Sequence, residues 1–118
     1  MSNETVRPRA SLHTLGCRLN QAETSVLGDL LSRHGYDIVP FGESTDLLVL
    51  NTCSVTDNAE KDCRYAVRKT LRHSPEAFVA VTGCYAQTGH ERLRHVPGID
   101  LLLGNQFKLE LPKYLAVS

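Results

Sequence analysis

Several short signatures that would assign a function at once are missing from this sequence. It contains no Cys-x-x-Cys pair, no Gly-x-Gly-x-x-Gly, no Walker-type loop and no His-Glu-x-x-His. Their absence argues against zinc-finger, thioredoxin and nucleotide-phosphate chemistry. The 13 basic and 13 acidic residues cancel, so the overall charge gives no reason to expect nucleic acid or an anionic membrane as a partner. Any such contact would have to come from a local patch.

Long apolar stretches are missing as well. No apolar run approaches the length that spans a bilayer, and the polar first ten residues lack the apolar centre of a secretory signal. We therefore expect a cytoplasmic location without membrane contact, where cysteines stay reduced and more often bind metal or do chemistry than form disulfides. The 118 residues correspond to one domain, which can bury a core without disulfide bonds.

The sequence does contain one arrangement that occurs three times. Apolar runs end at Cys17, Cys53 and Cys84, and a helix-start signal follows each cysteine by three or four residues. The runs suit short buried parallel strands, and each signal pairs a capping residue with a glutamate three positions later. The signals are Asn20-x-x-Glu23, Asp57-x-x-Glu60 and Thr88-x-x-Glu91. Each cysteine is therefore expected on a strand-to-helix turn.

Strands and helices are expected to alternate behind a flexible tail at residues 1–9. The expected strands lie at about 10–15, 37–39, 46–51, 77–82 and 99–103, and the expected helices at about 21–34, 57–73, 89–95 and 106–115. This order predicts a single α/β domain over residues 10–118, with a mostly parallel sheet and helices on both faces, in a Rossmann-like or flavodoxin-like three-layer arrangement. The first helix is expected to pack on the sheet through a stripe formed by Ala22, Val26, Leu27, Leu30 and Leu31.

The three turns are expected to meet in space. Turns after parallel strands lie along the carboxyl edge of the sheet, where open α/β sheets usually hold ligands. Cys17, Cys53 and Cys84 can thus converge, and nearby helix N-termini favour the thiolate that binds metals. A shared metal or iron–sulfur site is the favoured interpretation, while reactive thiols and incidental small residues stay open. Zinc normally needs a fourth ligand, and the nearest histidine in sequence, His90, lies on the following expected helix.

Other residues near these turns are expected to have structural roles. Cys63 falls on the apolar stripe of the expected long helix, so we interpret it as a buried small residue; a fourth ligand or redox partner is the alternative. Gly83 and Gly104 follow apolar runs and are expected to permit tight turns or close backbone approach. Asn51 is expected to order a turn through its amide.

The expected long helix also carries a basic face. The repeated positions are Lys61, Arg64, Arg68 and Arg72, with Lys69 and His73 beside them. Such a stripe could contact phosphate groups. A solvated helix face is the favoured interpretation, because acidic residues at the helix start and basic residues at its end suit the helix dipole without any partner.

The residues around the three cysteines resemble a known family. Residues 14–24 read Thr-Leu-Gly-Cys-Arg-Leu-Asn-Gln-Ala-Glu-Thr, residues 51–56 read Asn-Thr-Cys-Ser-Val-Thr and residues 81–87 read Val-Thr-Gly-Cys-Tyr-Ala-Gln. Over about residues 11–115, the chain resembles the N-terminal domain of the radical-SAM methylthiotransferases. The residues around the first and third cysteines are similar to those of the branch that methylthiolates threonylcarbamoyladenosine beside the tRNA anticodon. The resemblance implies that Cys17, Cys53 and Cys84 bind an auxiliary four-iron, four-sulfur cluster that holds or supplies sulfur.

The resemblance covers one domain of a larger enzyme. Family members continue into a radical-SAM barrel, which carries S-adenosylmethionine and a second four-iron, four-sulfur cluster, and then into an RNA-binding domain. Neither follows here, so this domain alone is expected to be inactive, with the barrel and tRNA as partners in the whole transferase. Lys61, Arg64 and Arg68 are candidates for tRNA or interdomain contact. The alternative is a non-enzymatic flavodoxin-like module for thiol or metal sensing, or for interaction.

Overall fold

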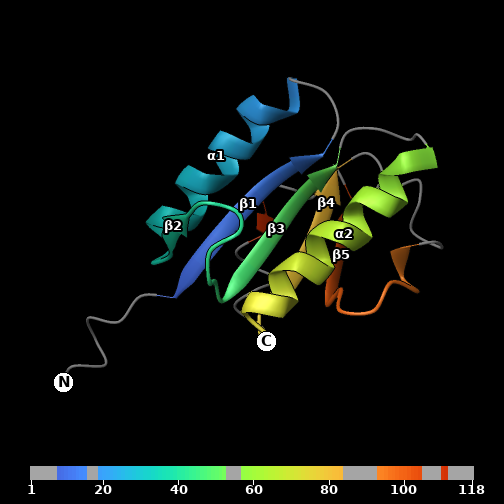
Figure 1. The fold of residues 1–118 in the computed structure, drawn as a ribbon. Helices are drawn as coiled ribbons and strands as arrows, with labels where there is room; N and C mark the ends of the chain where they lie inside the picture. Colours follow the sequence, from blue (N-terminus) through green and yellow to red (C-terminus); the bar gives the residue numbers. More distant parts are fainter. Residues whose placement is uncertain (1–7, 16–18, 53–56, 84–92, 105–109, 112–118) are drawn as a thin grey trace.

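Strands and helices alternate along the described part of the chain. The computed structural model describes residues 8–15, 19–52, 57–83, 93–104 and 110–111, with side chains described from Thr24 onward in the first helix and from Lys61 onward in the second. The elements are β1 (Arg9–Leu15), α1 (Leu19–Arg33), β2 (Asp37–Val39), β3 (Leu47–Thr52), α2 (Asp57–His73), β4 (Phe78–Gly83) and β5 (Leu101–Gly104) (Figure 1). These elements confirm the expected strands and the first two helices to within two residues. Of the helices expected at 89–95 and 106–115, the structure describes only residues 93–95 and 110–111, so neither helix is tested over its length.

The five strands form one parallel sheet in the order β2-β1-β3-β4-β5. Figure 1 shows α1 against one face and α2 against the other. The predicted α/β arrangement of three layers is thereby confirmed. No described helix is long and apolar enough to cross a bilayer.

Two hydrophobic clusters fill the spaces on either side of the sheet. Leu48, Leu50, Val79 and Val81 face α2, whereas Leu47, Val49 and Ala80 face α1. All six side chains of β3 are buried, which explains why its sequence is almost continuously apolar. The burial of such side chains contributes most of the stabilisation, at about 25 cal/mol per Å² of apolar surface removed from water.

The apolar stripe expected on α1 is only partly correct. Leu27 and Leu31 are fully buried against the sheet and Leu30 is half-buried, but Val26 is 51% exposed. Residue 26 lies about 100° around the helix from Leu27, outside the sector that reaches the strands. The side chain of Ala22 falls outside the described residues.

Both helices end at sequence signals that stop helical hydrogen bonding. After α1, Gly35 adopts φ +98°, and the amide of Tyr36 donates to the Leu31 carbonyl at 3.1 Å, which is the pattern of a glycine C-cap. After α2, Ser74 donates to the Thr70 carbonyl at 2.7 Å, and Pro75 has no amide proton with which to continue. Each chain reversal brings the next strand back to the amino edge of the sheet.

Candidate functional site at the carboxyl edge of the sheet

Four strands end in one row at the carboxyl edge. Leu15 of β1 pairs with Thr52 of β3, Thr52 with Gly83 of β4, and Gly83 with Gly104 of β5. The row aligns the chain positions that lead into the three sequence motifs, because Cys17 follows Leu15 by two residues and the other two cysteines directly follow Thr52 and Gly83. Cys17, Cys53 and Cys84 themselves lie outside the described residues, so their convergence stays a prediction.

Gly83 allows β3 and β4 to approach closely at this edge. Its φ is +106°, and a Cβ added there would fall on the backbone of Thr52. The hydroxyl of Thr52 donates to the Thr82 carbonyl at 2.9 Å and ties the same two strand ends together. The expectation that Gly83 permits close backbone approach is confirmed. Gly104 lies beside it in the row.

A buried polar row lies one residue before the strand ends, on the face that carries α1. Thr14, Asn51 and Thr82 are register partners on β1, β3 and β4. Thr24 of α1 joins them: its hydroxyl lies 2.7 Å from that of Thr14 and accepts a hydrogen bond of 3.1 Å from Asn51 Nδ2. Asn51 therefore links β3 to α1 through its amide, in addition to any effect on the following turn.

Thr82 completes this row with an unusual hydroxyl. Asn51 and Thr82 are both fully buried, yet within the described part of the chain the Thr82 hydroxyl has no hydrogen-bond partner. Buried polar groups are normally satisfied because leaving one unpaired costs about 1–3 kcal/mol. The sequence did not predict this row, because it indicated Thr14 and Thr82 only as parts of strands.

His13 occupies the opposite face of β1, towards α2. Its ring stacks on Phe41 with the centroids 4.0 Å apart and the planes 12° from parallel, and Lys69 Nζ lies 5.3 Å from the Phe41 centroid. Burial lowers the pKa of His13 below its ordinary value; Lys69 lowers it further, and Asp62 opposes the shift. The site thus favours a neutral imidazole that packs as an aromatic ring.

Metal ligands can be assessed only in the described residues. There, no group of three His, Cys, Asp or Glu side chains is arranged to hold a metal ion. Cys63 is fully buried in the cluster between α2 and the sheet, which confirms its interpretation as a core residue. His90 and the three motif cysteines are outside the described part.

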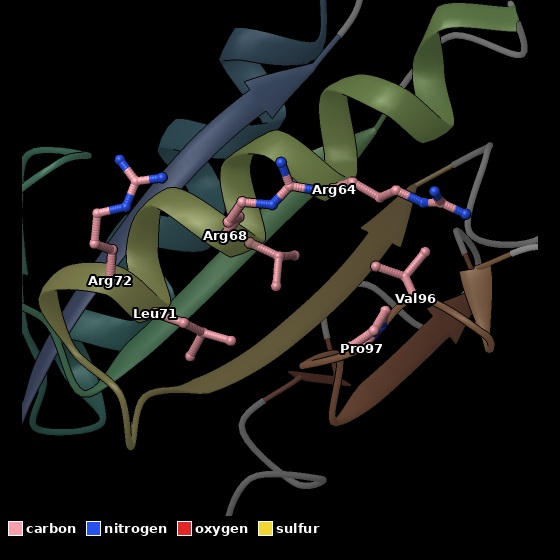
Figure 2. A pocket seen from close by; sticks show the side chains of 7 residues that line it. Arg64, Arg68, Leu71, Arg72, Val96 and Pro97 are labelled. Atoms are coloured by element: carbon pink, nitrogen blue, oxygen red, sulfur yellow. The ribbon is translucent and has the colours of Figure 1, made fainter.

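A second feature is a groove beside α2, with a volume of about 590 Å³. Figure 2 shows Leu71 of α2 facing Val96 and Pro97 of the segment that precedes β5, with three arginines along the helix. The lining residues are Arg64, Val67, Arg68, Leu71, Arg72, Val96 and Pro97. Of the sequence-predicted contact residues, Arg64 and Arg68 belong to this lining and Lys61 does not, although all three are exposed.

The sheet and its aligned strand ends define an α/β domain of the kind that holds a ligand at the carboxyl edge. Comparison with known proteins gives the family. The model of uncharacterized protein family UPF0004 matches residues 9–104. The chain belongs to this family, which forms the N-terminal domain of tRNA methylthiotransferases.

The similar proteins include two kinds of tRNA-modifying enzyme. Threonylcarbamoyladenosine tRNA methylthiotransferase MtaB is 36% identical over 89% of this chain in Bacillus subtilis (strain 168) and 39% identical over 91% of it in Aquifex aeolicus (strain VF5), covering 23% and 26% of those relatives. A tRNA-2-methylthio-N(6)-dimethylallyladenosine synthase from Chlorobium phaeobacteroides is 37% identical over 93% of the chain and 26% of the relative. The chain thus spans about a quarter of the length of these relatives.

Proposed function

We propose that this chain is the cluster-binding N-terminal domain of a tRNA methylthiotransferase, of the branch that acts on threonylcarbamoyladenosine. In this proposal Cys17, Cys53 and Cys84 bind an auxiliary four-iron, four-sulfur cluster. The observation that carries the proposal is the row of strand ends, in which β1, β3 and β4 stop in register within two residues of a cysteine. The names of the relatives support methylthiolation of tRNA as the reaction of the whole enzyme. The residues around the cysteines support the threonylcarbamoyladenosine branch.

The residues at this edge fit such a group. Thiolates are the ligands of iron–sulfur clusters, and helix starts nearby favour the thiolate form. Gly83 keeps the ends of β3 and β4 in close contact immediately before Cys53 and Cys84. The unpaired hydroxyl of Thr82, one residue further back, adds a polar group that is otherwise unexplained among the described residues.

Three protein thiolates are fewer than a four-iron cluster can accept. One iron would lack a protein ligand, and a bound cluster would then hold or supply sulfur at that open position. The chain contributes the thiolates and the rigid sheet edge that spaces them. Cleavage of S-adenosylmethionine, with its own cluster, would belong to a barrel domain outside this sequence, and the isolated domain is expected to be inactive.

The proposed partners follow from the same assignment. The substrate of the whole enzyme is a tRNA, bound in the cytoplasm, and the exposed residues Lys61, Arg64 and Arg68 are candidates for contact with it or with the barrel domain. A thiol- or metal-sensing module, or an interaction module, is the competing function, and nothing in the described residues favours it specifically.

Anaerobic reconstitution with iron and sulfide tests the ligand assignment. We expect the wild-type chain to take up about four irons with visible absorption, and the Cys17→Ala/Cys53→Ala/Cys84→Ala variant to take up none. Cys63→Ala is the matched control, because it removes a buried thiol away from the edge and should retain uptake. A folded wild type without iron, or a triple variant with a full complement, would refute the proposal and favour the sensing or interaction module.

A further inference from the structure

From Lys61 to its end, α2 concentrates positive charge in an otherwise balanced chain. Residues 61–73 carry five Lys or Arg side chains and one acidic residue, Asp62, whereas the first four residues of the helix include Asp57 and Glu60. Lys61, Arg64, Arg68 and Arg72 are all exposed. Since the whole chain has no net charge, this helix provides a local surface that attracts anions.

The arginines border an apolar groove. Arg64, Arg68 and Arg72 recur every four residues and thus lie on one side of α2, and all three line the groove whose floor includes Leu71 and Val96 (Figure 2). Among the described residues, none that lines it is acidic. The far wall is fixed by Gly98 with φ +95°, where a Cβ would lie 2.6 Å from Leu71 Cδ1 and 2.9 Å from Val67 Cγ1.

An exposed aromatic ring lies on the same helix. Tyr65 is 61% exposed, so its ring is available for contact with a partner. By helical spacing it lies beside Arg68, three residues on, and on the side of the arginine row away from the groove floor. The row is therefore flanked by an aromatic ring on one side and by an apolar groove on the other.

We propose that this surface binds a single-stranded segment of RNA, with phosphates against Arg64, Arg68 and Arg72 and bases stacked on Tyr65 and over the groove floor. Clustered arginines match a run of phosphates, and exposed aromatic and apolar surfaces match unpaired bases. Base-paired RNA would offer the phosphates but not the base faces. The inference rests on the proposed function, in which the substrate is a tRNA with an unpaired anticodon loop.

Fluorescence anisotropy with labelled RNA tests this surface in the whole 118-residue chain. The probes are a hairpin of the size of a tRNA anticodon arm and a fully paired duplex of the same length. The charge variant is Arg68→Gln/Arg72→Gln and the stacking variant is Tyr65→Ala. The matched control is Arg9→Gln/Arg33→Gln, which removes two exposed arginines outside α2.

The expected results separate charge from stacking. For three phosphate contacts to a single strand, the logarithm of the wild-type binding constant should fall with the logarithm of salt concentration with a slope of about −2, and the charge variant should show about −0.7. Tyr65→Ala should weaken hairpin binding by about fivefold or more without changing the slope. The control should match the wild type for the hairpin, and the duplex should bind more weakly than the hairpin.

Two outcomes would overturn the inference. Either the charge variant binds the hairpin as well as the control does, or the wild-type chain binds no RNA, which would favour the barrel domain as the occupant of this surface. Because α2 charge variants leave the cysteines in place, iron uptake by the same preparation is an independent readout. RNA binding can thus fail while the cluster proposal stands, and the reverse also holds.

Discussion

Replacing Gly83 by alanine should separate the ends of β3 and β4 and destabilise the domain. The residue combines two constraints: its φ of +106° is a conformation that L-residues rarely adopt, and a Cβ would collide with the backbone of Thr52 on the neighbouring strand. A collision with a backbone is not relieved by a rotamer change. The strands must move apart at the carboxyl edge, where Thr52 also donates its hydroxyl hydrogen bond to Thr82.

The size of the effect follows from these two terms. A non-glycine residue in the left-handed region costs about 1–3 kcal/mol, and forcing extra volume into a packed interior costs about another 1–3 kcal/mol. Together they predict a loss of about 2–6 kcal/mol in the free energy of unfolding. Domains of this size are stable by about 5–15 kcal/mol, so the variant should unfold at a much lower urea concentration.

Gly35→Ala provides the matched control for the strain term alone. Gly35 has φ +98° and nothing within 4 Å of an added Cβ, so we expect a loss of about 1–3 kcal/mol. Urea denaturation followed by far-ultraviolet circular dichroism measures both variants under identical conditions. If Gly83→Ala were no less stable than Gly35→Ala, the close contact with β3 would carry no energy and the reasoning would be wrong.

Three further perturbations test other parts of the structure. Because the pKa of His13 is lowered in the folded chain, the unfolded chain binds the proton more readily. The wild type should therefore lose stability as the pH falls below 6.5 through the folded-state pKa. The variant His13→Phe should remove that part of the pH dependence of urea denaturation. A double-mutant cycle of Asn51→Ala and Thr24→Val should give a coupling of about 0.5–1.5 kcal/mol for their 3.1 Å hydrogen bond; additive losses would mean that this bond contributes nothing. Leu27→Ala should lower the free energy of unfolding by about 2–5 kcal/mol because the Leu27 side chain is fully buried. Val26→Ala should change it by no more than about 0.5 kcal/mol. Equal thermal or urea stability of the two variants would contradict the assigned helix face.

Local signals account for the elements that the sequence predicted well. The bounds of α2 agree with the prediction at both ends. In the sequence, Asp57 and Glu60 form a helix-start signal, and Pro75 cannot donate the next helical hydrogen bond. The face of α1 was harder to predict. Five apolar residues there spread over too wide an arc for all to reach the sheet, and the position of the sheet, not helical periodicity, decides that Val26 is exposed.

The candidate site was also only partly predictable from the sequence. That several strands would end together at one edge was predictable, since parallel strands joined by helices share an orientation. The polar row of Thr14, Asn51 and Thr82 was not, because it depends on the register between strands far apart in sequence. The groove beside α2 was also beyond prediction. Its lining joins α2 to Val96 and Pro97, which are distant in sequence, and Gly98 beside them packs tightly against Val67 and Leu71.

The two proposed surfaces are connected by the direction of α2. The helix begins at Asp57, five residues after β3 ends at the carboxyl edge, and runs back along the sheet to His73 (Figure 1). Arg64 lies seven residues into it, about 10 Å along its axis from its first residue, and Arg72 lies near its far end. An RNA strand held from Arg72 to Arg64 would therefore point towards the strand ends that precede the cysteines. If both proposals hold, the charge on α2 would orient an RNA substrate along the path that leads to the proposed cluster.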